Sequence, residues 1–260
     1  MSKLLRSDFY RLFRSISFYI CTIVAMGLMA LNIFMMDMAN KMAGEEAMFD
    51  ITSRYKDGIS YGLTAFSNGN VQMLISIVMA IFVTAEFAHG TMKNVVSKGF
   101  SKLQIYFSKL ITMMAATYII IIATFIVGTL AATIIIGNIG DLNGDYLAQI
   151  FKTGGIEILL NTALVALLLL VAMVIRNLGG TIAINIIGIM TFGPLIFSLL
   201  EYLVKSKIKF SEFSLLANIA FLANSTAESS DYIRAIIVGI VFFTVSTVLG
   251  ITAFKKADVK

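Results

Sequence analysis

Residues 110–136 read LITMMAATYIIIIATFIVGTLAATIII, a run without a single charged side chain. A helix needs about 20 predominantly apolar residues to cross a bilayer, whereas a strand of a transmembrane β-barrel needs about ten residues of alternating polarity. The run is far longer than such a strand and does not alternate. It therefore predicts a transmembrane helix.

Five other stretches have the same character, so the chain as a whole predicts six transmembrane helices. Their expected bounds are about 16–36, 70–88, 155–175, 180–204 and 233–254. The composition agrees, since 58% of the 260 residues are hydrophobic and only 13% are charged, against about 45–50% and about 25% in soluble domains. The predicted fold class is an all-α membrane protein that forms one transmembrane domain over residues 1–260.

The basic residues predict the orientation of these helices. Six spans place both termini on one side of the membrane, and most of the lysines and arginines fall on that side. They are Lys3, Arg6, Arg11, Arg14, Lys93, Lys98, Lys102, Lys109, Arg176, Lys255, Lys256 and Lys260. By the positive-inside rule this side is cytoplasmic. The net charge of +5 is thus explained by topology, and it does not call for a nucleic-acid partner.

The segments outside the spans add further expectations. Residues 1–14, MSKLLRSDFYRLFR, gather Leu5, Phe9, Leu12 and Phe13 on one helical face, which predicts an amphipathic helix over about 1–15 that lies in the membrane interface. The residues singled out for this helix are Arg6, Phe9, Arg11, Phe13 and Arg14.

Two outer connections are long, and they differ in character. Residues 37–69 are acidic, contain several glycines and predict a loop. Within 205–232, the run FSLLANIAFLA at 213–223 is too short to span, so a re-entrant or interfacial segment is expected at about 210–224. In the fifth span, Pro194 predicts a kink that Gly193 eases.

The stretch that leads into 110–136 is basic, and it reads EFAHGTMKNVVSKGFSKLQIYFSK over 86–109. Gly90 and Gly99 bracket a short helix expected at about 91–98, with Thr91 as its N-cap. Ser101-Lys102-Leu103-Gln104 matches a capping box that would start the next helix.

The charges of this stretch carry their own expectations. Lys98, Lys102 and Lys109 border an apolar stripe and would extend toward water or lipid phosphate. Glu86 would be costly at the end of a span unless it is paired, and the expected partners are Lys93 or the N–H groups of the short helix. On its residues alone, the stretch is either a basic loop that fixes topology or a rigid helix presented to a cytoplasmic partner.

The pattern Glu86-x-x-x-Gly90-Thr91-x-Lys93-Asn94, with Gly99-x-Ser101-Lys102 and Tyr106-x-x-Lys109 after it, resembles a known segment. It is similar to the connection between the second and third spans of ABC-2 type transporter permeases, above all the small permeases of bacterial bacitracin, lantibiotic and modulin exporters. The sequence departs from that family at two points, because lysine stands at 93 and 102 where arginine is frequent, which weakens forked hydrogen bonding.

The resemblance implies an ABC exporter in the bacterial cytoplasmic membrane. It implies two copies of a separate ATPase subunit and a second permease chain, identical or homologous. The short helix would be the coupling helix that docks on the ATPase, aided by the N-terminal helix. The residues implied in coupling are Glu86, Gly90, Thr91, Met92, Lys93, Asn94, Val95, Lys98, Gly99, Ser101 and Lys102.

The sequence contains no G-x-x-x-x-G-K-[ST] phosphate-binding loop, so ATP hydrolysis is expected from the partner, which would hold ATP and Mg²⁺. This chain is therefore not expected to be an enzyme or to bind a cofactor or metal. The single histidine, His89, lies at a span border and not within a span, so the serine nucleophile with a histidine base of an intramembrane serine protease is not expected. A metal-dependent membrane protease would need an H-E-x-x-H motif, which the sequence lacks. The single cysteine, Cys21, rules out an intrachain disulfide and a cysteine cluster.

Polar residues within the spans are candidates for a substrate path. They are Asn32, Tyr118, Glu157, Asn161 and Asn185. Such groups can equally serve as hydrogen bonds between helices. The expected substrate is hydrophobic or amphipathic: a peptide, an antibiotic or a lipid-like molecule. A channel or secondary transporter that needs no ATPase, and a membrane immunity protein, remain alternative functions.

Overall fold

A computed structural model describes residues 1–43, 55–140, 143–204, 209–224 and 229–256. Within these ranges the chain is helical and contains no β-strand. Part of the loop predicted at 37–69, and Lys260 from the charge count, lie outside the described residues.

The helices follow one another with few gaps. Their bounds are α1 Ser2–Phe13, α2 Ile16–Ala43, α4 Gly58–Leu63, α5 Gly69–Ala88, α6 Thr91–Ser97, α7 Lys102–Ile136, α8 Gly144–Ile175, α9 Leu178–Ala183, α10 Gly193–Val204, α11 Leu215–Asn224 and α12 Ser229–Lys256. Short 3₁₀ helices occupy Thr64–Phe66 and Phe210–Phe213, and a π-helix occupies Ile184–Phe192. Six helical regions are long and apolar enough to cross a membrane: α2, α4 with α5, α7, α8, α9 with α10, and α12. This confirms the six predicted helices.

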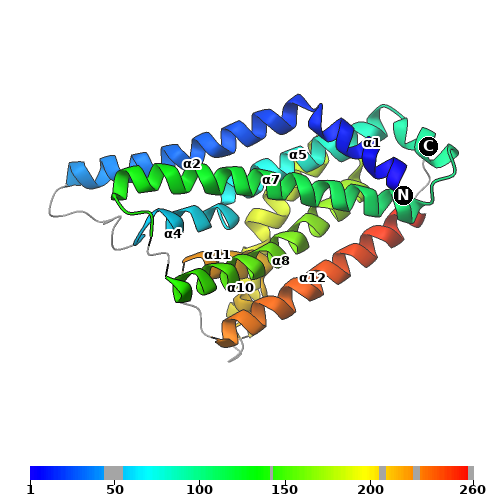
Figure 1. The fold of residues 1–260 in the computed structure, drawn as a ribbon. Helices are drawn as coiled ribbons and strands as arrows, with labels where there is room; N and C mark the ends of the chain where they lie inside the picture. Colours follow the sequence, from blue (N-terminus) through cyan, green and yellow to red (C-terminus); the bar gives the residue numbers. More distant parts are fainter. Residues whose placement is uncertain (44–54, 141–142, 205–208, 225–228, 257–260) are drawn as a thin grey trace.

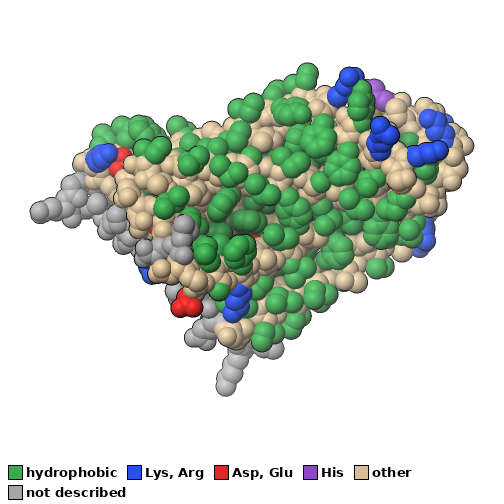
Figure 2. All heavy atoms as spheres, in the orientation of Figure 1, with side chains coloured by type: hydrophobic (Ala, Val, Ile, Leu, Met, Phe, Trp, Pro, Cys, Tyr) green, Lys and Arg blue, Asp and Glu red, His purple; other side chains and the backbone are tan. Residues whose placement is uncertain are grey.

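The long helices lie side by side and give the molecule two ends (Figure 1). The start of α1, the end of α12 and α6 lie at one of them, here called the terminal end. The end of α7 and the starts of α8 and α12 lie at the other, here called the far end. In Figure 2, lysine and arginine gather at the terminal end, while hydrophobic side chains cover the middle. This distribution is the one expected of a protein whose middle lies in lipid.

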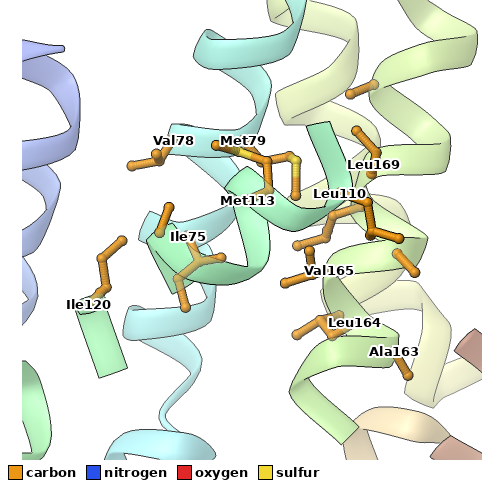
Figure 3. Close-up of a cluster of buried hydrophobic side chains, with 14 of the residues drawn as sticks. Ile75, Val78, Met79, Leu110, Met113, Ile120, Ala163, Leu164, Val165 and Leu169 are labelled. Carbon is orange, nitrogen blue, oxygen red and sulfur yellow. The ribbon is translucent and has the colours of Figure 1, made fainter. Parts of the chain in front are cut away.

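The core is packed between α5, α7 and α8, as Figure 3 shows. Ile75 and Met79 of α5 belong to the same buried cluster as Met113 of α7 and Leu164 and Leu169 of α8. All five are at most 3% exposed. The helices that carry the terminal-end residues described below are therefore joined by one continuous core.

The second span is broken, which the sequence did not predict. A helix, α4, occupies residues that were assigned to the loop 37–69. It begins with a capping box, in which the Asp57 carboxylate accepts from the Ser60 N–H at 2.7 Å. After the 3₁₀ turn at Thr64–Phe66, Asn68 caps α5 by accepting from the N–H of Asn70 at 3.0 Å. The prediction failed because six residues of helix are too few to show a helical period.

α4 approaches α7 closely because two of its residues are glycines. A Cβ atom at Gly58 would lie 2.8 Å from the carbonyl oxygen of Thr129, and one at Gly62 would lie 3.2 Å from the ring of Phe125. This small-x-x-x-small spacing lets two helices come together where no hydrophobic effect drives them in lipid.

The fifth span is widened where a kink was expected. Residues Ile184–Phe192 wind as a π-helix directly before Gly193 and Pro194. Proline has no N–H to donate, and its ring crowds the carbonyl four residues earlier. A wider turn relieves that crowding.

We expect Gly58→Ala to destabilise the protein by about 1–3 kcal/mol, because the added methyl group meets backbone atoms of α7 that cannot rotate away. Gly154→Ala is the matched control, since a Cβ atom at that helical position meets nothing within 4 Å. Thermal unfolding of the purified protein in detergent would compare the two. Equal unfolding temperatures would contradict the close packing of α4 on α7.

Candidate functional site

A short helix stands out from the bundle at the terminal end. α5 ends at Ala88, and Gly90 then adopts φ 66°, so the chain turns sharply into α6. Gly99, at φ 83°, makes the turn that leads from α6 toward α7. Ser101 and Gln104 then form the predicted capping box at the start of α7, with the Ser101 hydroxyl accepting from the Gln104 N–H at 3.2 Å. Both glycines are used because other residues rarely adopt these angles.

The N-cap of α6 differs from the prediction. Gly90 is the N-cap and Thr91 is the first residue of the helix. The Thr91 hydroxyl instead donates to the backbone carbonyl of Glu86 at 3.3 Å. The threonine therefore fastens the turn to the last part of α5.

α6 has a buried side and an exposed side. Met92 is 1% exposed, and Val95 and Val96 pack partly against the same core. Lys93 and Asn94 are exposed. The helix is thus anchored by one apolar side, with a cation and an amide directed away from the bundle.

Beneath α6 lies a cluster of four charged residues from three helices, here called the charge cluster: Asp8 and Arg11 of α1, Glu86 of α5 and Lys109 of α7. The ammonium group of Lys109 contacts the carboxylates of Asp8 and Glu86, the latter at 2.5 Å. The guanidinium group of Arg11 pairs with the same Glu86. Two acids and two bases meet, so the cluster is formally neutral.

The cluster is buried and held by further hydrogen bonds. Asp8, Glu86 and Lys109 are 3%, 4% and 1% exposed. The Ser108 hydroxyl donates to Asp8 at 2.6 Å. Since removing charges from water is favourable only when they are paired and hydrogen-bonded, these contacts make the arrangement possible.

Arg11 is the member of the cluster nearest to solvent. Its guanidinium group donates to the carbonyl of Phe82 at 3.0 Å and lies 3.9 Å from the centre of the Phe82 ring. Burial lowers the pKa of Arg11, and the negative charge of Asp8 opposes this change. A group of such high intrinsic pKa remains charged.

Two predictions about these residues were wrong. Glu86 pairs with Arg11 and Lys109, not with Lys93 or the N–H groups of α6. Lys109 does not extend toward lipid or water, since it is 1% exposed. The reason is that α1 folds across the ends of α5 and α7 and brings a carboxylate to that lysine.

The buried face of α1 also differs from the predicted one. Leu4, Asp8 and Leu12 form the buried stripe, whereas Phe13 is 46% exposed. The i, i+4, i+8 spacing of two leucines around an aspartate was the signal that could have identified Asp8. It was missed because an acid was counted only as a solvated charge. Arg6 and Arg14 are exposed, as expected of an interfacial helix.

A cavity of about 520 Å³ lies beside the charge cluster, between α1, the end of α5 and α6. Its lining includes Arg11, Arg14, His89, Thr91 and Val95. The N-terminal helix and α6 therefore flank one hollow at the terminal end.

The predicted path residues are scattered. Asn32 is exposed on α2, and Asn185 is buried in the π-helix, where neither side-chain atom finds a partner among the described residues. The hydroxyl of Tyr118 donates to the carbonyl of Ile158 on α8 at 3.1 Å. Glu157 and Asn161 lie one turn apart on α8, with the Asn161 amide donating to the backbone carbonyl of Glu157 at 2.9 Å.

A family model described as "ABC-2 family transporter protein" matches residues 4–193. The match runs from α1 to the first residue of α10, so it includes the charge cluster and α6. It bears out the resemblance to ABC-2 permeases, while the bacitracin, lantibiotic and modulin subfamily remains a prediction. A search of curated proteins found no match.

We expect Lys109→Met to destabilise the protein by about 3–5 kcal/mol, because it leaves two buried carboxylates without their shared cation. The triple variant Asp8→Asn, Glu86→Gln, Lys109→Met removes all three charges and should recover most of that loss. Thermal unfolding in detergent is the measurement, and Lys98→Met, at an exposed position of the same stretch, is the control. A Lys109→Met protein as stable as this control would refute the pairing.

Proposed function

Because this chain belongs to the ABC-2 transporter family, and is thereby a membrane-spanning permease subunit of an ABC transporter, we propose that it exports a hydrophobic or amphipathic molecule from a bacterial cell. Two permease chains, identical or homologous, would form the path, and two copies of a separate ATPase would drive it. Both termini would lie in the cytoplasm.

The observation that carries the proposal is the construction of α6. A stiff helix bracketed by two glycines in the left-handed region projects from the end that collects the basic residues. Met92 is buried against the bundle, and Lys93 and Asn94 are available to a partner. These features are those of a lever that transmits force from a docked protein.

The charge cluster supports the same mechanism. It ties α1 to α5 and α7 directly beneath the turn that leads into α6. A displacement of α6 would therefore move the ends of the second and third spans, together with the N-terminal helix. Separate loops that merely fixed topology would need no such buried connection.

The exposed lysines suit docking on an acidic surface. The Lys93 ammonium group is a point charge that can approach carboxylates from several directions. The hollow between α1 and α6 adds a recess that a segment of the ATPase can enter. ATP and Mg²⁺ belong to that partner, because this sequence has no phosphate-binding loop.

We expect Lys93→Glu to lower the affinity for the ATPase subunit about tenfold, since a repulsive contact replaces an attractive one at the rim of an interface. Co-purification with the ATPase, and permease-dependent ATP hydrolysis in vesicles, would measure the loss. Lys41→Glu is the control, because that lysine is exposed and lies in the last turn of α2, at the end of this helix that is farther from α1.

Two results would contradict the proposal. If Lys93→Glu binds the ATPase and supports export normally, α6 is not the docking helix. If the chain transports substrate without any ATPase, a channel or secondary transporter is the better assignment.

The proposed orientation has a separate test. In a Cys21→Ala background, a cysteine introduced at the exposed position Lys98 should react with a membrane-impermeant maleimide only in inside-out vesicles. A cysteine at the exposed position Lys56 should react only in intact cells or spheroplasts. The reverse pattern would place the termini outside.

A further inference from the structure

One face of α8 carries a column of buried polar side chains at the far end. Thr153, Glu157 and Asn161 follow at intervals of four residues, so they lie one above another on the helix. Glu157 and Asn161 are each 1% exposed. Neither carboxylate oxygen of Glu157, nor the side-chain oxygen of Asn161, has a hydrogen-bond partner within the described part of the chain.

Glu157 differs in this respect from the other buried acids. Asp8 and Glu86 are paired with Lys109 inside the bundle. The lysine nearest to Glu157 in sequence, Lys152, is placed with its ammonium group 3.9 Å from the centre of the Tyr232 ring. No lysine or arginine among the described residues forms an ion pair with Glu157. An unpaired carboxylate at this depth is costly, so the group either holds a proton or binds a cation that this chain does not itself supply.

A polar cavity lies next to the part of α8 that precedes Glu157. It has a volume of about 550 Å³, lies at the far end, and is lined by Lys56, Asp57, Asp145, Tyr146 and Thr153, among others. Thr153 is also the residue one helical turn before Glu157. The lining of the cavity therefore includes a residue one turn along α8 from the acid, whereas Glu157 itself lies behind that lining.

One helical turn beyond Glu157, Asn161 meets the break in the second span. The break in the second span leaves the carbonyl of Phe66 pointing at α8 and α5. It accepts from the Asn161 amide at 3.2 Å and from the Gln72 amide at 3.3 Å. With its N–H groups donated in this way, Asn161 offers only its oxygen to anything else. In membrane transporters, cations are coordinated where spans are broken and backbone carbonyls are freed.

We propose that Glu157 is the anionic ligand of a monovalent-cation site, filled from the far-end cavity, with Asn161 supplying a neutral oxygen. The cation is either an inorganic ion or the ammonium group of a transported amphipathic molecule. The site has one formal negative charge, which a single positive charge neutralises. The ammonium alternative rests on the proposed export function, whereas the inorganic ion does not.

The test uses a carbodiimide, dicyclohexylcarbodiimide, which modifies protonated carboxyl groups in apolar surroundings. The purified chain in lipid nanodiscs is treated at one pH and one ionic strength in N-methylglucamine chloride, sodium chloride, potassium chloride or hexylammonium chloride. Mass spectrometry of peptides then gives the rate of modification at each acid. Asp8 and Glu86 are internal controls, because their ion pairs should protect them in every salt.

We expect Glu157 to be modified in N-methylglucamine and protected about tenfold by the cation that binds. Protection by sodium or potassium identifies an inorganic ion, and protection by hexylammonium alone identifies an ammonium group. Modification at the same rate in all four salts would mean a permanently protonated acid and would overturn the proposal. Absence of modification in all four would mean a hidden partner and would overturn it as well.

A variant separates binding from folding. Glu157→Gln should unfold at the same temperature as the parent protein in N-methylglucamine but lose the rise in unfolding temperature that the bound cation produces. Glu212→Gln, which changes an acid that is 39% exposed by side chain, should keep that rise. These assays contain no ATPase, so their failure would leave the export function untouched, and a failure of docking at α6 would leave the cation site untouched.

Discussion

The terminal end of this protein depends on one ammonium group. Lys109 is buried on α7, where it contacts both Asp8 of α1 and Glu86 of α5, and Arg11 supplies the second positive charge. An unpaired charge in this position would cost several kcal/mol, so any arrangement in which one helix is displaced is penalised. The positions of α1, of the end of α5 and of the turn at Gly90 therefore all depend on this pairing. The position of the exposed face of α6 depends on it as well.

The same requirement, that polar groups within the bundle find partners, accounts for the irregular parts of the fold. Where Pro194 cannot donate an N–H, the preceding turns widen into a π-helix. Where the second span breaks, the free carbonyl of Phe66 is taken by the amides of Asn161 and Gln72. The requirement is not met everywhere, since both side-chain atoms of Asn185 and both carboxylate oxygens of Glu157 are among the buried polar atoms without a partner among the described residues. Glu157 differs from the other buried acids because neither of its carboxylate oxygens is bonded.

Local features of the sequence predicted local features of the structure. Length and composition identified six membrane-crossing regions, and the Ser101–Gln104 capping box marked the start of α7. The pairing of Lys109 with Asp8 could not be predicted in this way, since the two residues are 101 positions apart and their meeting depends on how α1 folds back. α4 was missed for a different reason: its packing depends on Gly58 and Gly62 facing α7, and six residues display no period. The features that the sequence did not predict here are contacts between helices, α1 with α7 and α4 with α7.

The charge cluster and the break in the second span are joined by a single helix. α5 runs from Gly69 to Ala88, about 30 Å at 1.5 Å per residue. Glu86 of the charge cluster lies in its last turn, while Gln72, which holds the Phe66 carbonyl beside Asn161, lies in its first. Its middle is packed through Ile75 and Met79 into the core that also holds α7 and α8 (Figure 3). A close-packed helix moves as a body rather than by deforming. A shift imposed on α6 and the charge cluster would therefore reach the polar break next to Glu157 through α5. The coupling contact and the cation site, proposed on separate grounds, would then act at the opposite ends of one rigid element.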